Sequence, residues 1–397
     1  MKEGWTYKKL GEVCEIFGRI GFRGYTKNDL VNSPEAGAIT LSPSNIIDGE
    51  MNYGKCSYIT WAKYEESPEI KIYPGDILLV KTASVGKTAL VKYLPHKATI
   101  NPQFVVLKKI SINNEYLSYY LKSEKAQNFI WSIAKGAAAQ TVSQKNLAEM
   151  IVPNPALSEQ QRVVSRLDAA FSHIDELKAN AEKQLSEARA LFQKSLAKAM
   201  EPKEGWKENT LKEVSTISGD YGLSVSSKPF DGIRYLRITD ITDSGELNDD
   251  KVSAEVDDPK KQEELEEGDI LFARTGATVG KTLVYKKKYG KCLFAGYLIR
   301  YRLNKSIIAP GFMHYFTHSN EYYDWVNMNQ EAAAQPNISA KKYNLLLVKY
   351  PPLSEQQRIV ERLDALSAHI RELEENQKKI ISECDALKQA LLRKVFE

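Results

Sequence analysis

Long apolar segments are absent from the chain. No stretch reaches the roughly 18 consecutive apolar residues typical of a membrane-spanning helix. The opening residues, MKEGWTYKKL, have no apolar core of the kind found in a signal peptide. We therefore expect a protein that stays in the cytoplasm.

Cysteine is also scarce. The four cysteines, at positions 14, 56, 292 and 384, are far apart, and no two of them form a CxxC pair. We therefore expect reduced thiols buried as small apolar groups. Hydrophobic residues make up 43% of the chain and charged residues 27%, which are ordinary values for globular domains.

The net charge is only +4, so total charge says little about a polyanionic partner. Its distribution is more informative. Residues 1–150 carry 19 basic against 14 acidic residues, 203–270 carry 9 against 18, and 271–349 carry 12 against 3. A domain with oppositely charged sequence halves can present one basic face to a nucleic acid, although scattered surface lysines would give the same counts.

The chain is one unit of about 200 residues repeated. LSEQQRVVSRLDAAFSHIDEL at 157–177 returns as LSEQQRIVERLDALSAHIREL at 353–373, with 15 of 21 positions identical at an offset of 196. Shorter motifs return as well: EGW, GDIL, VGKT and AAAQ each occur in both halves. Each unit begins with about 150 residues of short apolar runs and short helical patterns, which predict a mixed α/β globule.

Each unit ends in a long predicted helix. Ser158 with Gln161, and Ser354 with Gln357, have the spacing of a capping box. Apolar residues then recur at spacings of 3 and 4, a heptad pattern typical of paired helices. These residues are Leu167, Ala170, Ile174, Leu177, Ala181, Ala188 and Leu191 in the first helix, and Leu363, Leu366, Ile370, Leu373, Ile380, Cys384, Leu387 and Leu391 in the second.

We expect the two helices to pair with each other. Gln184 and Gln377 interrupt the two stripes, where a polar residue could fix the register at some cost in stability. Antiparallel pairing would relate the two halves by an approximate twofold axis. A helix of about 40 residues spans roughly 60 Å and could act as a ruler between two separated half-sites on DNA.

The alternation of globules with LSEQQRxVxRLD helices resembles the specificity subunit of type I restriction-modification systems, as do ARTGATVGKT at 273–282 and AAAQPNIS at 332–339. The resemblance implies an α+β chain with two mixed α/β target-recognition domains, at 1–155 and 202–352. Two spacer helices, at 156–201 and 353–397, would form an antiparallel coiled coil. The first globule departs from the pattern, with KTASVGKT and AAAQTVS at the matching places.

The resemblance also implies partners. Each globule would read one half of a split, asymmetric site in double-stranded DNA, and the helices would dock two adenine-N6 methyltransferase subunits, with restriction subunits joining later. S-adenosylmethionine, ATP and magnesium would be bound by those partners, and this chain would bind no cofactor or metal and have no catalytic residue. The matching helix starts make six residues candidates for partner binding, namely Gln161, Arg162, Arg166, Gln357, Arg358 and Arg362.

Candidate DNA contacts are polar side chains on glycine-rich loops and on framework motifs. Arginine can read guanine, asparagine and glutamine can read adenine, and lysine, serine and threonine contact phosphates. In the first globule the candidates are Arg19, Arg23, Tyr25, Lys27, Lys87 and Gln140. In the second they are Tyr221, Ser224, Ser226, Ser227, Lys228, Arg234, Arg237, Arg274, Thr275, Lys281, Gln335, Asn337 and Ser339. Arg234 and Arg237 would face opposite sides of a strand, so at most one of them is expected to face DNA.

Motifs that suggest catalysis are incomplete. GATVGKT at 276–282 is one residue short of a phosphate-binding loop, and NPQF at 101–104 lacks the second proline of the amino-methyltransferase motif. His314 and His318 have a zinc-compatible spacing, but no third ligand is evident. Three alternatives stay open: a reader or antagonist from a related system, a stand-alone methyltransferase or nuclease, and a bivalent protein-interaction scaffold.

Overall fold

The computed structural model describes residues 4–19, 23–136, 139–256, 264–330 and 336–397. It separates into two compact units, both of which contain parts of the long helices. Unit 1 consists of Met1–Glu182 with Lys378–Glu397, and unit 2 consists of Lys183–Gln377. In the described part of the chain, no helix combines the length and apolar character needed to cross a membrane.

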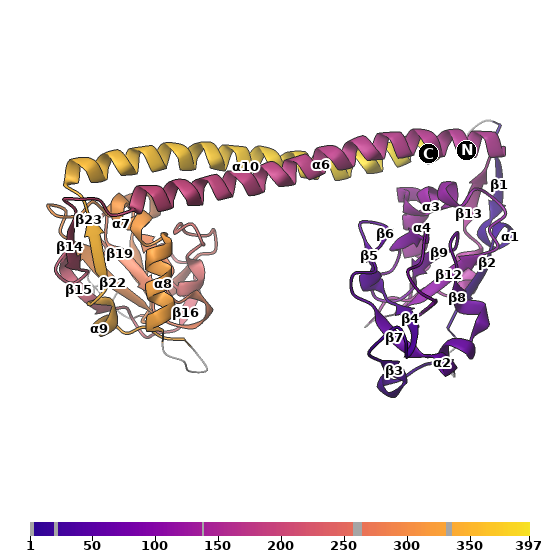
Figure 1. Ribbon diagram of the computed structural model, residues 1–397, viewed down its shortest axis with the longest axis horizontal. Helices are drawn as coiled ribbons and strands as arrows, with labels where there is room; N and C mark the ends of the chain where they lie inside the picture. Colours follow the sequence, from indigo (N-terminus) through magenta and orange to yellow (C-terminus); the bar gives the residue numbers. More distant parts are fainter. Residues whose placement is uncertain (1–3, 20–22, 137–138, 257–263, 331–335) are drawn as a thin grey trace. The chain divides into compact units, whose positions relative to one another are not determined.

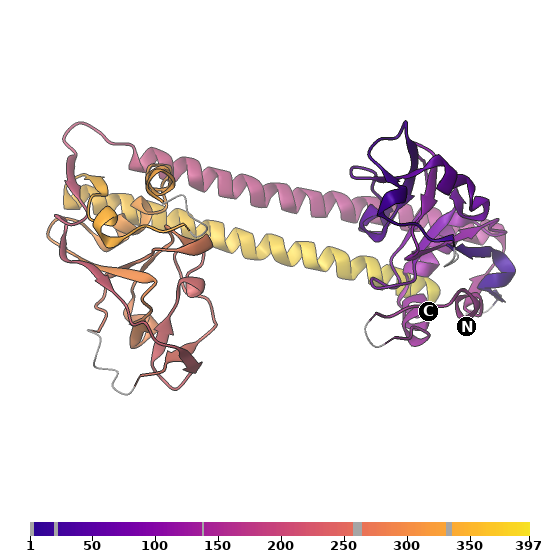
Figure 2. The same cartoon turned by 90° about the horizontal axis from the view of Figure 1, so that it is seen from below.

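The long helices are α6 (Leu157–Met200) and α10 (Leu353–Phe396), each of 44 residues. They lie side by side (Figure 2) and run antiparallel: residues that come later in α6 contact residues that come earlier in α10. In unit 1, Asp175 pairs with Lys388, and Lys178 with Asp385. The predicted antiparallel coiled coil is confirmed.

The globule of unit 1 contains two main sheets. An antiparallel four-stranded sheet has the order β10 (Thr88–Leu90), β9 (Ile77–Val80), β12 (Phe104–Lys108), β2 (Glu15–Gly18). A five-stranded sheet has the order β3 (Leu30–Val31), β7 (Ser57–Thr60), β4 (Gly37–Leu41), β11 (Ala98–Ile100), β8 (Lys71–Ile72), and its β4·β11 pair is parallel. Two-stranded ladders join β1 (Thr6–Lys9) to β13 (Ile151–Asn154), and β5 (Ile46–Ile47) to β6 (Glu50–Met51).

The globule of unit 2 has a counterpart of the four-stranded sheet, and its other described strands form two-stranded ladders in place of the five-stranded sheet. Its four-stranded sheet has the order β15 (Ser215–Tyr221), β22 (Leu298–Leu303), β19 (Ile270–Ala273), β20 (Thr282–Val284). The remaining ladders are β14 (Lys207–Thr210) with β23 (Leu347–Tyr350), β16 (Ser227–Pro229) with β18 (Val252–Ala254), and β17 (Arg234–Leu236) with β21 (Cys292–Phe294). The central strands β9 and β19 are fully buried runs of apolar residues, as the GDIL motifs predicted.

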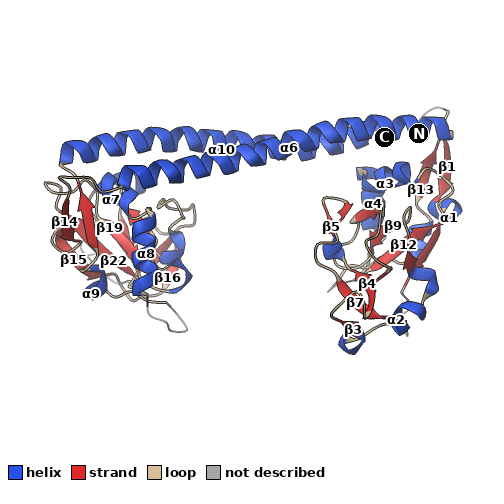
Figure 3. Cartoon of the chain, viewed as in Figure 1, coloured by secondary structure: helices blue, strands red, loops and turns tan. Residues whose placement is uncertain are grey.

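Short helices accompany the strands in both units (Figures 1 and 3). In unit 1 they are α1 (Leu10–Val13), α2 (Trp61–Glu65), α3 (Asn114–Lys122), α4 (Glu124–Ser132) and α5 (Gln144–Ala148). In unit 2 they are α7 (Pro310–Phe316), α8 (Asn320–Asn329) and α9 (Ala340–Tyr343). Serine caps begin α4 and α8: the hydroxyls of Ser123 and Ser319 accept bonds from the amides of Ala126 and Tyr322.

Each hydrophobic core includes the end of the helix that belongs to the other repeat. In unit 1, Leu392 and Phe396 of α10 are buried with the residues of α3, and the Phe396 ring lies 5.4 Å from the ring of Tyr116. At the matching positions in unit 2, Leu196 and Met200 of α6 are buried in the core that contains α7. Both globules therefore depend on a helix that the other repeat supplies.

Two expectations about the helices are wrong. The serines are not N-caps, since the first intrahelical bonds run to the carbonyls of Ala156 and Pro352, so the helices begin before Ser158 and Ser354. The apolar stripes are also not buried throughout. Leu177, Leu191 and Leu387 are about half exposed, whereas Ile174, Ala181 and Ala188, spaced seven residues apart on α6, are buried.

Buried glutamines tie the helix starts to the globules. The Gln160 side chain accepts a bond from the amide of Asn113 (2.8 Å) and donates to Asn154 Oδ1 (3.2 Å) and to the carbonyl of Pro155 (2.9 Å). Gln356, at the offset of 196, makes the same kind of contacts in unit 2 with the amide of Ala309 and the carbonyls of Ile307 and Pro351. The repeated QQ motif thus holds each helix in place through its first glutamine.

All four cysteine thiols are free, and Cys56 is half-buried while the others are buried. Desolvation raises the pKa of the Cys14 thiol to about 12, so this group is unreactive near neutral pH.

Candidate nucleic-acid interface

Five polar and aromatic residues of unit 2 meet where β15 and β19 end and β22 begins. We call this group the second-globule edge; it consists of Tyr221, Arg274, Thr275, Tyr297 and Asn337. The Arg274 guanidinium lies over the Tyr221 ring, 4.9 Å from its centroid, and Arg274 Nε donates to Asn337 Oδ1 (3.2 Å). Tyr221 and Tyr297 are 46% and 61% exposed. Such a group can offer an arginine fork, an amide and phenol hydroxyls to DNA.

Backbone bonds hold the second-globule edge together. The Arg274 amide donates to the carbonyl of Tyr297 (3.0 Å), and the Arg274 carbonyl accepts from Ile338 (2.9 Å). Thr275 and Asn337 form an antiparallel bridge. These bonds fix three separate chain segments, so the side chains are positioned by the framework and not by a free loop.

The first-globule edge occupies the matching place in unit 1 and consists of Lys81, Thr82, Gln103, Gln140 and Thr141. The Lys81 amide donates to the carbonyl of Gln103 (2.7 Å), and its carbonyl accepts from Val142 (2.8 Å). The Thr82 and Thr141 hydroxyls are 2.9 Å apart. The backbone pattern is therefore that of the second-globule edge, with different side chains on it.

The turns that follow Thr82 and Thr275 in the two edges both begin with a residue in the left-handed conformation. Ala83 has φ +67°, close to the φ +70° of Gly276 at the corresponding point of the second-globule turn. A non-glycine residue rarely adopts this left-handed conformation. The first turn, KTASVGKT, is one residue shorter than RTGATVGKT and lacks its 3-10 helix at Gly276–Thr278, but it keeps the left-handed residue at its start.

Arg19 is not available for base contact, which corrects the sequence-based expectation. It is 4% exposed, and its guanidinium donates to the carbonyl of Ile100 (3.0 Å) and to the Thr99 hydroxyl (3.1 Å). Desolvation lowers its pKa, and its guanidinium also lies over the Tyr25 ring. Arg19 acts as a brace for the loop that carries Arg23, which contacts Glu69 at 3.4 Å.

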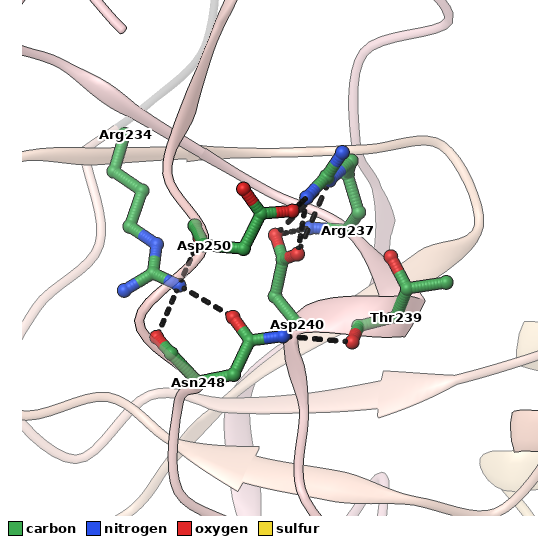
Figure 4. Close-up of polar contacts among 6 residues, drawn as sticks. All are labelled: Arg234, Arg237, Thr239, Asp240, Asn248 and Asp250. Atoms are coloured by element: carbon green, nitrogen blue, oxygen red, sulfur yellow. Dashed lines mark hydrogen bonds and ion pairs between the residues drawn. The ribbon is translucent and has the colours of Figure 1, made fainter. Parts of the chain in front are cut away.

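Arg234 is also unavailable for base contact, which corrects a second sequence-based expectation (Figure 4). It is 6% exposed, and its Nη2 donates to the carbonyls of Asn248 (2.8 Å) and Asp250 (2.7 Å). Arg237 is bound to the carboxylates of Asp240 and Asp250, which raise its pKa. Both arginines organise the 234–250 segment.

The other predicted contacts are distributed over both globules. Lys27, Lys87, Gln140, Ser224, Ser226 and Ser227 are exposed. Lys228 binds Asp231 (2.7 Å) and contributes to lowering the pKa of that carboxyl to about 2, while Lys281 binds Asp243 (2.7 Å). The Ser339 side chain caps α9. Gln335 lies outside the described residues.

The six predicted partner-binding residues are all exposed at the beginnings of α6 and α10. Arg162 bonds with both carboxylate oxygens of Glu159 at 2.8 Å. Exposed leucines add to the repeated surface, since Leu191 of α6 and Leu387 of α10 occupy corresponding positions at the offset of 196.

Sequence reasoning missed Lys81, Gln103 and Tyr297. Each lies directly beside a strand, Lys81 after β9, Gln103 before β12 and Tyr297 before β22, and aligning the two copies strand by strand would have pointed to them. It also missed the bonds of Tyr119 and Tyr315 to Asp168 and Asp364, which fasten α3 and α7 to the long helices at the same offset of 196.

The incomplete catalytic motifs have structural roles in the described chain. The Asn101 side chain accepts from the amide of Gln103 (2.9 Å), so NPQF forms a turn. The rings of His314 and His318 lie 4.4 Å apart between centroids and are tilted by 45°, and burial lowers the pKa of His314 to about 3. Among the described residues, no group of three or more histidine, cysteine, aspartate or glutamate side chains could hold a metal ion.

Comparison with known proteins identifies the family. Residues 2–187 and 203–383 match the type I restriction modification DNA specificity domain. The chain belongs to this family. Members of the family are the recognition subunits of type I restriction-modification systems, which act on DNA within multi-subunit complexes, and catalysis lies on partner subunits. The resemblance carried by the LSEQQR helices is confirmed.

Relatives match along the whole chain. The EcoKI specificity subunit of Escherichia coli K12 and the StySPI specificity subunit of Salmonella potsdam are each 24% identical, with 100% of this chain and 89% of each relative covered. A solved chain from work on complex assembly and conformational transition of the type I R-M system superposes with a TM-score of 0.77 at 22% identity, covering 100% of this chain and 98% of that one. The HsdS subunit of Thermoanaerobacter tengcongensis gives 0.57 at 22% identity, covering 100% and 97%. These similarities show the fold.

Proposed function

We propose that each globule of this specificity subunit reads one half of a bipartite, asymmetric DNA site through its edge. The observation that carries the proposal is that the two edges share one backbone arrangement and differ in side chains. Lys81 corresponds to Arg274, and Gln103 to Tyr297. A common frame with different donors is what reading two unlike half-sites requires.

We further propose that the helix pair sets the spacing between the half-sites and docks two adenine-N6 methyltransferase subunits, with restriction subunits joining later. The support is the repeated exposed surface at the helix starts, because equal surfaces suit two copies of one partner. The complex would act on DNA in the cytoplasm, and the partners would bind S-adenosylmethionine, ATP and magnesium. The proposed domain limits are 1–155, 156–201, 202–352 and 353–397.

The central test replaces Arg274 in the complete complex. The subunit is co-expressed with its methyltransferase partners, and modified adenines are mapped by sequencing. Arg274→Ala should relax one half of the recognised sequence and leave the other unchanged. Arg274→Lys separates two roles: if it also relaxes that half, the guanidinium reads a base, and if it restores recognition, the side chain contacts a phosphate.

A matched control removes the same charge elsewhere in unit 2. Lys287 is exposed and follows β20, at the opposite end of the sheet from Arg274. Lys287→Ala should leave both half-sites unchanged. If Arg274→Ala weakened both half-sites equally, or behaved like the Lys287 variant, the assignment of the edge would be wrong.

The spacing proposal has its own test. Inserting seven residues after Glu182 and seven before Lys378 preserves the heptad phase and lengthens both helices by about 10 Å, or about three base pairs. The mapped sites should keep both half-sequences, with a spacer longer by about three base pairs. An unchanged spacer would rule out the ruler.

A further inference from the structure

Two ion pairs across the helix seam occupy corresponding places in the repeat. In unit 1, Lys178 Nζ lies 3.0 Å from Asp385 Oδ1. In unit 2, Arg189 Nε lies 2.7 Å from Glu374 Oε1. At the offset of 196, position 178 corresponds to 374 and position 189 corresponds to 385. The repeat would allow the charges in either order, yet both cations are on α6 and both anions are on α10.

This arrangement opposes pairing between two copies of the same helix. If two α6 helices lay in this antiparallel register, Lys178 of each would face Arg189 of the other. Two α10 helices would bring Glu374 against Asp385. Like charges across a helix interface are unfavourable and select against that pairing.

A third ion pair adds to the same selection. Asp175 of α6 binds Lys388 of α10. The corresponding positions are 371 and 192, which hold arginine and phenylalanine. Two α10 helices would therefore also place Arg371 against Lys388.

A polar contact in the seam provides an independent observation. Gln377 is 7% exposed, and its Nε2 donates to Gln184 Oε1 at 3.0 Å. The corresponding positions hold Ala181 and Ile380. A pair of α10 helices would set the Gln377 amide against Ile380, and a pair of α6 helices would set Gln184 against Ala181. Either pairing loses the amide bond, and the cost is greater for two α10 helices, because the buried Gln377 amide would lose this partner whereas Gln184 is exposed.

We propose that the seam carries a pairing code by which the helix of the first repeat accepts the helix of the second repeat and rejects another copy of itself. The code keeps two dissimilar globules together where a duplicated sequence could otherwise join two identical ones. The pairing rule is independent of DNA. Its benefit, an asymmetric recognition site, rests on the proposed function.

The test follows the pairing of both halves, starting from the folded full-length protein. A protease site is placed in the exposed 201–205 segment between α6 and β14, and purified protein carrying either of two tags is cut there. The two preparations are mixed and equilibrated in mild denaturant. Native mass spectrometry then counts complexes of first with second halves, first with first, and second with second. We expect wild-type halves to recombine almost entirely as first with second.

Charge exchange at one ion pair should weaken the selection, leaving only the contributions of the Asp175–Lys388 pair and the glutamine contact. Lys178→Glu combined with Asp385→Lys preserves an attractive α6·α10 pair. It also makes same-helix pairs attractive, because the new carboxylate at position 178 would face Arg189 and the new ammonium group at position 385 would face Glu374. We expect same-half complexes to increase by about tenfold or more. Arg189→Glu combined with Glu374→Lys makes the corresponding exchange at the other ion pair and should increase same-half complexes to a similar extent. This second variant keeps the test decisive if the first fails to fold.

Exchanging both ion pairs is the matched control. The fourfold variant Lys178→Glu, Arg189→Glu, Glu374→Lys, Asp385→Lys restores repulsion between like helices and should again form only first-with-second complexes. Same-half complexes at statistical proportions in the wild type would overturn the proposal. An unchanged distribution after either single exchange would overturn it as well. Neither result would bear on the mapping of modified adenines, so this proposal and the proposed function can fail separately.

Discussion

The two globules agree where they meet the helices and differ in their second sheet and in the side chains of their edges. Both have a four-stranded sheet of the same order, a tyrosine bound to a helix aspartate, and a glutamine that fastens the helix start. Beyond this frame, the first globule builds a five-stranded sheet, whereas the second has only two-stranded ladders in the described residues. The contrast separates a part of each globule that assembles the molecule from a part that is free to vary.

The largest effect should come from truncating the helix ends in the cores. Phe396→Ala removes a ring that contacts Tyr116 and Tyr120 in unit 1, and should destabilise that unit by about 3 kcal/mol or more. Met200→Ala, the matching change, should destabilise unit 2 by about 2 kcal/mol. Hydrogen exchange with mass spectrometry resolves the two units. Equal loss of protection in both after either change would mean that the globules are not separate cooperative units.

The next effect concerns the fastening glutamines. Gln160→Ala removes three hydrogen bonds of a side chain that is 3% exposed, and should cost about 2–3 kcal/mol, seen as faster exchange at the start of α3. Gln356→Ala should do the same at the start of α7. The neighbouring Gln161 is exposed, so Gln161→Ala is the control and should leave exchange unchanged. Equal effects of Gln160→Ala and Gln161→Ala would contradict this reading.

A smaller change in stability, of opposite sign in the two globules, should come from substitutions at Ala83 and Gly276, which begin corresponding turns. Ala83→Gly relieves a left-handed conformation and should stabilise unit 1 by about 1 kcal/mol. Gly276→Ala should destabilise unit 2 by a similar amount through backbone strain alone, since no atom lies within 4 Å of the added methyl group. Denaturant unfolding measures both. Changes of the same sign would show that the turns are not equivalent.

The last effect is a difference in acid stability, which appears only at low pH. Burial opposes ionisation of Glu246, but bonds from Lys286 and Tyr289 outweigh it and lower the pKa to about 2. Since the unfolded carboxyl titrates near 4.5, this stabilisation is fully present above that pH and is lost as the pH falls toward 2. Glu246→Gln should flatten this loss in unit 2 and leave unit 1 unaffected, as measured by unfolding at several pH values. An unchanged acid dependence of unit 2 would show that Glu246 does not contribute.

Sequence reasoning reached the architecture because helix pairing and strand burial follow from periodic patterns. The heptad stripes predicted that the two long helices pair, the family resemblance implied that they run antiparallel, and the GDIL runs predicted strands. Sequence reasoning predicted the residues of the DNA-contacting site less well. Arg19 and Arg234 have the residue type of a base reader, but burial and intramolecular bonds occupy them, and neither property can be read from their neighbours in sequence.

The sequence by itself determined the duplication, the two long helices and the family, because these depend on identity at a fixed offset and on local periodicity. The tertiary structure alone decided which side chains share a surface. Tyr221, Arg274 and Asn337 are far apart in the chain and meet only because backbone bonds join three segments. It also decided which charge faces which across the seam, since a heptad pattern predicts that helices pair but leaves the register to packing and to the polar groups that meet there.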